Sequence, residues 1–596
     1  MFSVRTLLLA LSSAVFTNAA ARTHRFQGLL APIAAPPQIS VPAAPVTDVN
    51  GTEIPPYDVL YSFEQLVDHK KLTAGTFTQR YYHTWEFYIP GGPIIIFTPG
   101  ELNVEGYQGY LTNRTIPGRI AQENGGAVIV LEHRFFGWSN PKSDLSDESL
   151  KLLTVEQAIE DMAYFANNVK LPMPNGDQVS PTKAPWVIVG GSYSGALTSW
   201  VLNTKKEFWA GYSSSGVVQA ARSNWGYTEV IRQNAQKNCT ADIERVIDHI
   251  DKTFTFGTPA QIQALKANWN MGNITHLDDV AGALRYNLWE WQDLSPTSTR
   301  DAGFHVFCDA LEVKDGVSAG SDGWGLENAL KAWGSYWNET YYAQVCGDTN
   351  AVDCLGSYDS TQEFWHDTSL DQYYRSWTWL TCTQLGYSFD GAPLGWPTIT
   401  SRLMTPPYSE RQCTYWFNRT YPLGPTPAAT LQTNLLTKGW LSNAKRLFFA
   451  NGQKDPWREV TMSTDFLPIK STETQPIAVS SGGYHCTDLI TRYAQSDASI
   501  KQVQDLGMAY MGLWLAQWHA ANLKMPMGKN ATLTDPAGLP KPGAGKTIIP
   551  QTVIDSPPAA APSLPASSGS KSSDGGRARF HVIPDPMVMD ALAADA

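Results

Sequence analysis

The stretch Trp186-Val-Ile-Val-Gly-Gly-Ser192-Tyr-Ser-Gly195 decides the fold. Its apolar run predicts a buried strand, its glycines predict a sharp turn, and the residues from 195 to 206 predict an amphipathic helix. At such a turn a serine hydroxyl is lifted clear of the backbone, and the next amide points towards a bound carbonyl oxygen. Ser192 is therefore a candidate nucleophile. Ser194 stands where this pattern usually has glycine, and a plain Gly/Ser turn is the alternative interpretation.

Other short apolar runs predict further buried strands, at 93–97, 127–131, 446–450 and 477–479. Helical patterns lie between several of the runs, at 154–169 and 195–206, and another follows at 500–521. This alternation predicts an α/β fold with a parallel sheet flanked by helices. The stretch 217–440 has no comparable strand run, holds six of the seven cysteines and shows helix-like segments at 241–254 and 258–269. We expect a largely helical insertion there.

The ends of the chain differ in composition from this central part. Residues 1–21 combine Arg5, a short apolar run and three alanines, which is typical of a secretory signal peptide. The expected segments are a signal peptide at 1–21, a Pro/Ala-rich arm or pro-segment at 22–56, core parts at 57–216 and 441–530 around the insertion at 217–440, and a disordered Pro/Ala/Ser/Gly-rich tail at 535–596. Nothing catalytic is expected in the arm.

Charge and hydropathy exclude several classes of protein. The 596 residues carry a formal net charge of −11 and no basic stripe, so nucleic acid is a poor partner. No segment after the signal peptide reaches the ~18 apolar residues that a membrane span requires. The sequence predicts a secreted protein, or one in a vacuolar or lysosomal lumen, and leaves monomer and homodimer open.

The cysteines and glycosylation motifs fit an oxidising compartment. The chain has seven cysteines, of which six would pair in one of fifteen ways. No Cys-x-x-Cys or helical His-x-x-x-His pattern supports a metal site, so we expect no metal and no cofactor. Candidate glycosylation sites are Asn50, Asn113, Asn238, Asn273, Asn338, Asn418 and Asn530.

A serine nucleophile needs a base and an acid that orients the base, and in this architecture both follow the serine in loops after sheet strands. Asp455 follows the predicted strand 446–450 in a loop marked by glycine and proline, and His485 follows the strand 477–479 after a glycine turn. Seven of the eleven histidines lie after Ser192, but only His485 combines a preceding strand with a glycine turn. Taken singly, Asp455 could be a turn or N-cap residue and His485 a structural histidine.

The chain resembles the prolyl carboxypeptidase-like serine peptidases, and most closely the fungal acid prolyl endopeptidases among them. The resemblance spans roughly residues 60–525 and rests on motifs at 63–69, 75–81, 97–101 (Phe-Thr-Pro-Gly-Glu), 132–137 (Glu-His-Arg-Phe-Phe-Gly), 190–197, 451–457 (Asn-Gly-Gln-Lys-Asp-Pro-Trp) and 482–486 (Gly-Gly-Tyr-His-Cys). It implies an α/β-hydrolase core with a helical domain inserted after the nucleophile. It also implies cleavage on the carboxyl side of proline, with proline-containing peptides or proteins as substrates.

Site residues follow from the resemblance motif by motif. Ser192 is the nucleophile, His485 the base and Asp455 the residue that orients it. The oxyanion hole would comprise the amide of Tyr193 and a second amide from Gly100 or Glu101. Trp457 is a tentative wall of the proline pocket, with a core tryptophan as the alternative, and Arg134 is left out of the site. The implied disulfides are Cys239–Cys308, Cys346–Cys354 and Cys382–Cys413, with Cys486 free.

Other functions remain open at this level. A carboxypeptidase, an endopeptidase and a dipeptidyl- or tripeptidyl-type aminopeptidase differ in what closes the ends of the cleft, which the sequence does not reveal. An esterase or lipase could use the same fold and serine turn. A non-catalytic glycoprotein that kept the fold would also match, but it would have no need for all three triad positions.

Overall fold

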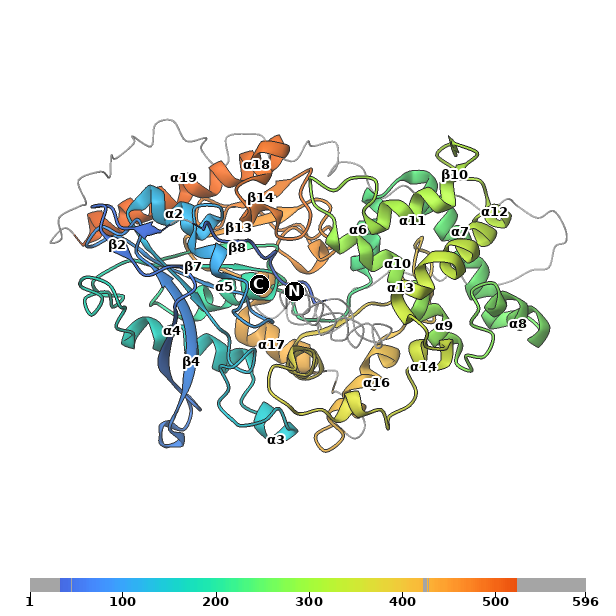
Figure 1. Ribbon diagram of the computed structural model, residues 1–596, viewed down its shortest axis with the longest axis horizontal. Helices are drawn as coiled ribbons and strands as arrows, with labels where there is room; N and C mark the ends of the chain where they lie inside the picture. Colours follow the sequence, from blue (N-terminus) through green and yellow to red (C-terminus); the bar gives the residue numbers. More distant parts are fainter. Residues whose placement is uncertain (1–32, 44, 422–425, 427, 523–596) are drawn as a thin grey trace, which may run out of the picture. The chain divides into compact units, whose positions relative to one another are not determined.

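The centre of the molecule is an eight-stranded sheet, seen in the computed structural model that describes residues 33–43, 45–421, 426 and 428–522 (Figure 1). Its strands are β3 (Leu60–Leu66), β4 (Thr76–Thr84), β5 (Ile94–Thr98), β6 (Ala127–Leu131), β7 (Trp186–Gly191), β8 (Ala210–Ser214), β13 (Leu447–Gly452) and β14 (Ile477–Ser480). The strand order is β14-β13-β8-β7-β5-β6-β4-β3. The six strands from β14 to β6 are parallel, so their carboxyl ends share one edge.

The predicted parallel sheet is a mixed sheet in the structure. Strand β4 runs antiparallel to both β6 and β3 at one edge. Neither β3 nor β4 is a continuous apolar run: exposed and partly buried positions alternate along β3, and β4 carries polar residues such as Gln79 and His83 even where it is buried. Strand β8 was also missed, since its buried residues are small or polar, as Gly211 and Ser213 illustrate.

Side chains that alternate along the strands build a core on each face of the sheet. Ile94 and Ile96 of β5 pack into one hydrophobic cluster, and Ile95 and Phe97 into the other. Helices α4 (Val155–Asn168) and α5 (Tyr193–Thr204) contribute to the first cluster. Helices α2 (Ile116–Asn124) and α19 (Ala498–Ala521) contribute to the second and run along the same face of the sheet (Figure 1). Each face of the sheet is therefore covered by helices and has its own hydrophobic core.

The ends of these helices follow from local sequence. The Thr154 side chain caps α4 by accepting a hydrogen bond from the Gln157 amide at 3.1 Å. Asp497 caps α19 in the same way, and α2 ends at Gly125 with a φ of 65°. Two short helices, α3 (Asp147–Leu150) and α18 (Tyr493–Ser496), and the two-stranded pair β1 (Val46–Thr47) and β2 (Glu53–Ile54) complete this part.

Between β8 and β13 the chain is largely helical. The helices are α6 (Gly226–Asn234), α7 (Lys237–Phe256), α8 (Pro259–Ala267), α9 (Leu277–Leu284), α10 (Tyr286–Trp289), α11 (Gly303–Glu312), α12 (Leu326–Tyr336), α13 (Tyr342–Cys346), α14 (Ala351–Leu355), α15 (Tyr373–Leu380), α16 (Pro406–Trp416) and α17 (Ala429–Thr437). Short strands pair here as β9 (Ala221–Ser223) with β12 (Gly386–Ser388), and β10 (Val313–Lys314) with β11 (Val317–Ser318). The predicted fold, an α/β-hydrolase core with a helical insertion, is confirmed.

Three disulfides lie in the insertion and join Cys239 to Cys308, Cys346 to Cys354 and Cys382 to Cys413, the same pairs that the resemblance implies. Cys486 is a buried free thiol. Of the sequon asparagines within the described residues, Asn238 is half-buried and its amide donates to Ser318 and Ala319, while the others are exposed. Asn530, the signal peptide and the predicted tail lie outside the described residues.

Candidate active site

Ser192 occupies a strained turn between β7 and α5. Its φ of 59° and ψ of −126° are rare for a residue with a side chain. The turn is closed from within, because the Ser194 hydroxyl donates to the Gly191 carbonyl oxygen at 2.8 Å and accepts from the Gly191 amide at 3.0 Å. A Cβ on Gly190 would lie 2.0 Å from the Ser194 carbonyl oxygen, so glycine is required there. Serine at position 194 therefore supports this turn.

Asp455 and His485 meet although 30 positions separate them. Asp455 lies just past the end of β13 and His485 just past the end of β14, and these strands are neighbours. His485 Nδ1 donates to Asp455 Oδ1 at 2.8 Å, and the Trp457 amide donates to the same oxygen at 2.9 Å. Burial by itself lowers the pKa of His485, but the adjacent Asp455 carboxylate more than offsets this and holds the pKa well above its ordinary value.

Ser192 lies at the same edge of the sheet as this pair. The Ser192 amide donates to the Ser214 carbonyl oxygen at 2.9 Å, and the Cys486 thiol donates to the same oxygen at 3.9 Å. A Cβ on Gly191 would lie 2.9 Å from Cys486 Sγ. The residues next to Ser192 and His485 in the chain are thus in contact, and the parallel strands bring all three predicted residues into one neighbourhood.

The second ring nitrogen of His485 contacts the N-terminal arm. His485 Nε2 lies 2.9 Å from the carbonyl oxygen of Ala34, a residue that is only 4% exposed. Sequence reasoning missed this contact. The one available signal was that a Pro/Ala-rich segment precedes a chain whose motifs imply recognition of proline.

The predicted oxyanion residues lie beside the serine turn. Tyr193 is the first residue of α5, and first-turn amides have no acceptor within their own helix. A Cβ on Gly100 would lie 3.2 Å from the side chains of Tyr193 and Ser194, which brings the loop after β5 against the turn. The Gly100 amide donates to Thr98 Oγ1 at 3.2 Å, which favours Glu101 as the second donor. Burial raises the pKa of the Glu101 carboxyl to about 8, so this side chain is neutral in acid.

The Glu-His-Arg motif after β6 contacts residues that border the site and holds them in place. His133 Nε2 accepts a hydrogen bond from the Tyr193 hydroxyl at 3.0 Å, and burial lowers the pKa of His133 to about 4, so its ring is neutral. Glu132 accepts from the Val104 amide at 3.1 Å and so anchors the loop that carries Glu101. Arg134 is fully buried and forms an ion pair with Asp161, which makes it a structural residue.

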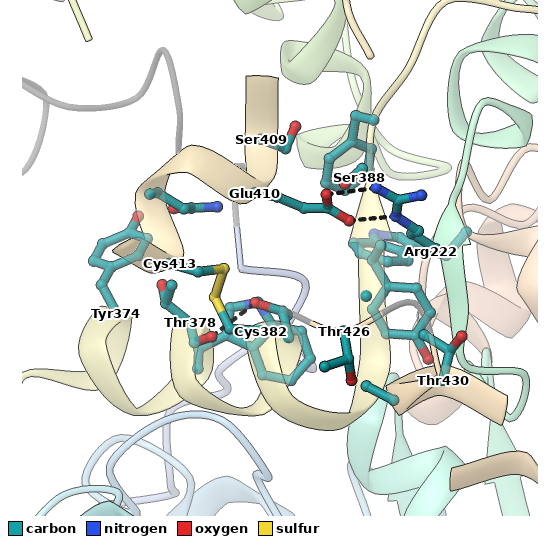
Figure 2. Close-up of a pocket in the computed structure, with 18 residues that line it drawn as sticks. Arg222, Tyr374, Thr378, Cys382, Ser388, Ser409, Glu410, Cys413, Thr426 and Thr430 are labelled. Carbon is teal, nitrogen blue, oxygen red and sulfur yellow. Dashed lines mark hydrogen bonds and ion pairs between the residues drawn. A yellow bond between two sulfur atoms is a disulfide. The ribbon is translucent and has the colours of Figure 1, made fainter. Parts of the chain in front are cut away.

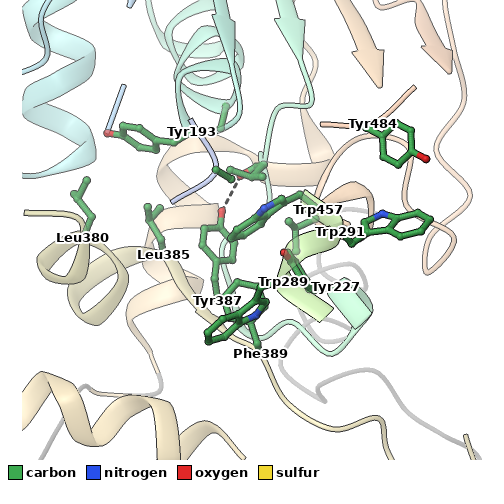
Figure 3. Packing of buried hydrophobic residues seen from close by; sticks show 14 of the residues in the cluster. Tyr193, Tyr227, Trp289, Trp291, Leu380, Leu385, Tyr387, Phe389, Trp457 and Tyr484 are labelled. Atoms are coloured by element: carbon green, nitrogen blue, oxygen red, sulfur yellow. Dashed lines mark hydrogen bonds between the residues drawn. The ribbon is translucent and has the colours of Figure 1, made fainter. Parts of the chain in front are cut away.

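Trp457 is buried among aromatic rings (Figure 3). Its ring makes edge contacts with Tyr227, Tyr387 and Phe389, and its centroid lies 6.5 Å from that of His485. Its indole Nε1 donates to Gln292 Oε1 at 2.7 Å, which ties the Asp455 loop to the helical insertion. The tryptophan is therefore a core residue that also borders the site.

Trp457 also lines a pocket that the helical insertion encloses (Figure 2). The walls include Trp377 and Tyr387, and the disulfide between Cys382 and Cys413 lies in the lining. Arg222 and Glu410 form a bidentate ion pair within the lining, with N···O distances of 2.5 and 2.7 Å. The Tyr387 hydroxyl donates to the Val217 carbonyl oxygen at 2.8 Å, close to the serine turn. Apart from Trp457, which borders the site, the residues that line the pocket belong to the insertion.

The described part of the chain shows neither a metal site nor a membrane span. Among residues 33–522, apart from the few positions not described, no group of three or more His, Cys, Asp or Glu side chains is arranged to hold a metal ion. Within the same part of the chain, no helix has both the length and the apolar character that crossing a membrane requires.

Several proteins similar to this chain are named as serine proteases or carboxypeptidases. Relatives include the serine protease vicPa of Bipolaris victoriae, 34% identical over 78% of this chain and 90% of that protein. A probable extracellular serine carboxypeptidase of Arthroderma benhamiae is 28% identical over 74% of this chain and 65% of that protein. The human lysosomal Pro-X carboxypeptidase is 24% identical over 79% and 91% of the two chains.

Among solved structures, an esterase of Pyrobaculum calidifontis aligns over 86% of this chain and all of its own, with 8% identity and a TM-score of 0.29. A proline iminopeptidase of Mycobacterium smegmatis aligns over 75% of this chain and 99% of its own, with 11% identity and a TM-score of 0.30. The sequence pattern described as Serine carboxypeptidase S28 matches residues 65–506, which is most of the chain. The chain therefore belongs to the serine carboxypeptidase S28 family and is a serine peptidase.

Proposed function

We propose that this serine peptidase is secreted and hydrolyses peptide bonds on the carboxyl side of proline through an acyl-enzyme. The observation that carries the proposal is the 2.8 Å hydrogen bond between His485 and Asp455 at the sheet edge that also holds the strained Ser192. A nucleophile, a base and an orienting acid in this order are the parts that acyl transfer needs.

In the proposed reaction, Ser192 Oγ attacks the carbonyl carbon of the substrate while His485 Nε2 accepts the hydroxyl proton. Asp455 stabilises the imidazolium that forms. The amide of Tyr193, with a donor from Glu101, binds the developing oxyanion. His485 then gives its proton to the leaving amine, and water hydrolyses the resulting ester with His485 again as the base.

Proline specificity is proposed from the aromatic lining of the adjacent pocket. A prolyl ring is apolar and its nitrogen carries no proton, so it is recognised by shape and by aromatic walls. Trp457 and Tyr387 offer such walls close to His485 and the serine turn. The name of one relative, lysosomal Pro-X carboxypeptidase, points in the same direction. Secretion is proposed from the signal-like segment 1–21 and the disulfides.

The test compares Ser192→Ala with Ser199→Ala, which removes a buried hydroxyl from the helix that follows the serine turn. We expect Ser192→Ala to abolish hydrolysis of a peptidyl-prolyl p-nitroanilide and labelling by a fluorophosphonate, while Ser199→Ala retains both. Mass spectrometry of the products from a peptide with internal and penultimate prolines then separates endopeptidase, carboxypeptidase and aminopeptidase modes. Undiminished turnover by Ser192→Ala, or activity on a short acyl ester with none on any peptide, would contradict the proposal.

A further inference from the structure

Residues 33–40 lie in the active site as an extended peptide. The side chains of Ala34 and Pro36 are buried, whereas those of Gln38 and Ser40 are exposed. From Ile33 to Pro37, half-buried and buried side chains alternate, and this period of two is that of an extended chain with one side against a surface. The segment forms no strand pairing, so its position depends on contacts with the site itself.

The contacts are made mainly by the backbone of the segment. Four carbonyl oxygens accept hydrogen bonds from side chains of the site: Ile33 from Gln292 Nε2 at 3.4 Å, Ala34 from His485 Nε2 at 2.9 Å, Pro36 from the Tyr107 hydroxyl at 2.9 Å, and Pro37 from the Tyr110 hydroxyl at 2.9 Å. Side-chain donors that hold successive carbonyls recognise a peptide largely without regard to its sequence. Such an arrangement suits the binding of a peptide substrate.

The surface under the segment is shaped for close approach by a backbone. A Cβ on Gly191, the residue before the nucleophile, would lie 2.9 Å from Cγ of Pro36. A Cβ on Gly109 would lie 2.1 Å from the Ile39 carbonyl oxygen. Only glycine at these two positions leaves room for the segment.

The contact with His485 prevents the ring from acting as a base. Nδ1 faces the Asp455 carboxylate and Nε2 faces the Ala34 carbonyl, and neither oxygen has a proton to give. Both ring nitrogens must therefore donate, so His485 is held as the imidazolium. In this form Nε2 cannot accept the proton of Ser192.

The register of the segment also protects it from cleavage by a proline-specific site. The carbonyl beside His485 belongs to Ala34, and the prolyl carbonyls of Pro36 and Pro37 are bound by the tyrosine hydroxyls instead. The segment therefore binds like a substrate without presenting a prolyl bond to the base.

From these contacts we infer that residues 33–40 are a built-in inhibitor, which fills the groove for peptide substrates until it is cut away or displaced. The inference rests on the proposed function, because it assigns the groove to peptides. While it is attached to the chain, the segment has an effective concentration on the order of 1 mM at the groove. Once cut, the peptide dissociates from the groove when the protein is at micromolar concentration. For a peptide with a Kd of about 100 µM, the uncut chain is then about tenfold less active than the cut one.

The first experiment places a recognition sequence for a site-specific protease between Pro42 and Pro45 of the full chain. The matched control carries the same insertion in the exposed turn at Asp315 and Gly316, between β10 and β11. We expect cutting after Pro42 to raise kcat/KM on a peptidyl-prolyl p-nitroanilide, and the rate of fluorophosphonate labelling, by about tenfold or more. Cutting the control should change neither rate.

A second variant tests the segment without proteolysis. Pro36→Glu puts a carboxylate into the buried position against Gly191 and should release the segment. The kcat/KM of the uncut variant should then equal that of the cut chain. Val41→Glu, at an exposed position just after the segment, should not raise the kcat/KM of the uncut chain. A labelled peptide matching residues 31–42 should bind the cut Ser192→Ala chain, measured by fluorescence anisotropy, and should compete with substrate in the active cut chain.

The outcomes separate this inference from the proposed function. Equal activity of the cut and uncut chains, with both forms active, overturns the inhibitory role and leaves the proposed function standing. Failure of the peptide to bind the cut chain also overturns the inference. Binding of the peptide without hydrolysis or Ser192 labelling in any form overturns the proposed function, and the inhibitory role with it.

Discussion

Replacing Asp455 with Asn removes the charge beside His485 and keeps the shape of the side chain. Asp455 is fully buried, and its Oδ1 accepts from both His485 Nδ1 and the Trp457 amide. Because the Trp457 amide needs an acceptor, it favours the amide orientation that keeps oxygen at the Oδ1 position. The substitution therefore tests the charge, with the hydrogen bond to His485 retained.

The expected loss follows from the attraction between the carboxylate and the imidazolium. Two unit charges about 4 Å apart at an effective dielectric constant of about 20 attract by about 4 kcal/mol. A factor of ten in rate corresponds to about 1.4 kcal/mol, so kcat should fall about a thousandfold. The KM for a peptidyl-prolyl p-nitroanilide should change little at a pH above the pKa of His485, because the ring is then neutral in the free site and the imidazolium forms only as the serine is deprotonated.

A matched control is Asp488→Asn, which alters another buried carboxylate at the same edge of the sheet. Asp488 accepts from the Ser214 hydroxyl at 2.7 Å and the Tyr212 hydroxyl at 3.0 Å, and no hydrogen bond links it to His485 in the described part of the chain. We expect less than a tenfold fall in kcat for this variant. Both proteins are compared in the same state of the N-terminal arm, with thermal unfolding as the check on folding. A kcat within tenfold of the unaltered protein for Asp455→Asn would refute the reasoning.

Further predictions concern pH dependence and stability. Glu101 is neutral below its pKa of about 8, and its ionisation would place a negative charge near the oxyanion, so kcat/KM should fall as the pH rises through 8. In Glu101→Gln this fall should move to higher pH. A pH–rate profile in which the fall stays at the same pH would exclude the role of Glu101. Arg134→Met removes the arginine partner of the buried Asp161 carboxylate, leaves only His69 paired with it and should lower the free energy of unfolding by about 3–5 kcal/mol. Denaturant titration measures this loss, and a loss below about 1 kcal/mol would contradict the structural role. Replacing the Cys239–Cys308 disulfide, whose cysteines are 69 positions apart, should lower the free energy of unfolding by about 4 kcal/mol. Replacing Cys346–Cys354, with a separation of 8, should lower it by about 2.5 kcal/mol, and the reverse order would argue against loop entropy as the cause.

The sequence alone was sufficient for features that neighbouring residues create. The run ending at Gly191 predicts β7, and the small residues around Ser192 predict the turn, because both depend on side chains a few positions apart. The same reasoning did not predict strands such as β3 and β8, which are not continuous runs of large apolar residues. Their burial depends on the partners that the fold supplies, as when Gly211 leaves room for the side chain of Leu202.

Tertiary structure decided which residues meet. The sequence offered Asp455 and His485 as separate loop residues, and the adjacency of β13 and β14 set the distance between their side chains. It offered the N-terminal segment only as a Pro/Ala-rich arm, and the fold placed the Ala34 carbonyl against the imidazole of His485. Local order arises from contacts between near neighbours in the chain. A site assembled from distant loops depends on how the strands are ordered in the sheet, and no short stretch of sequence contains that order.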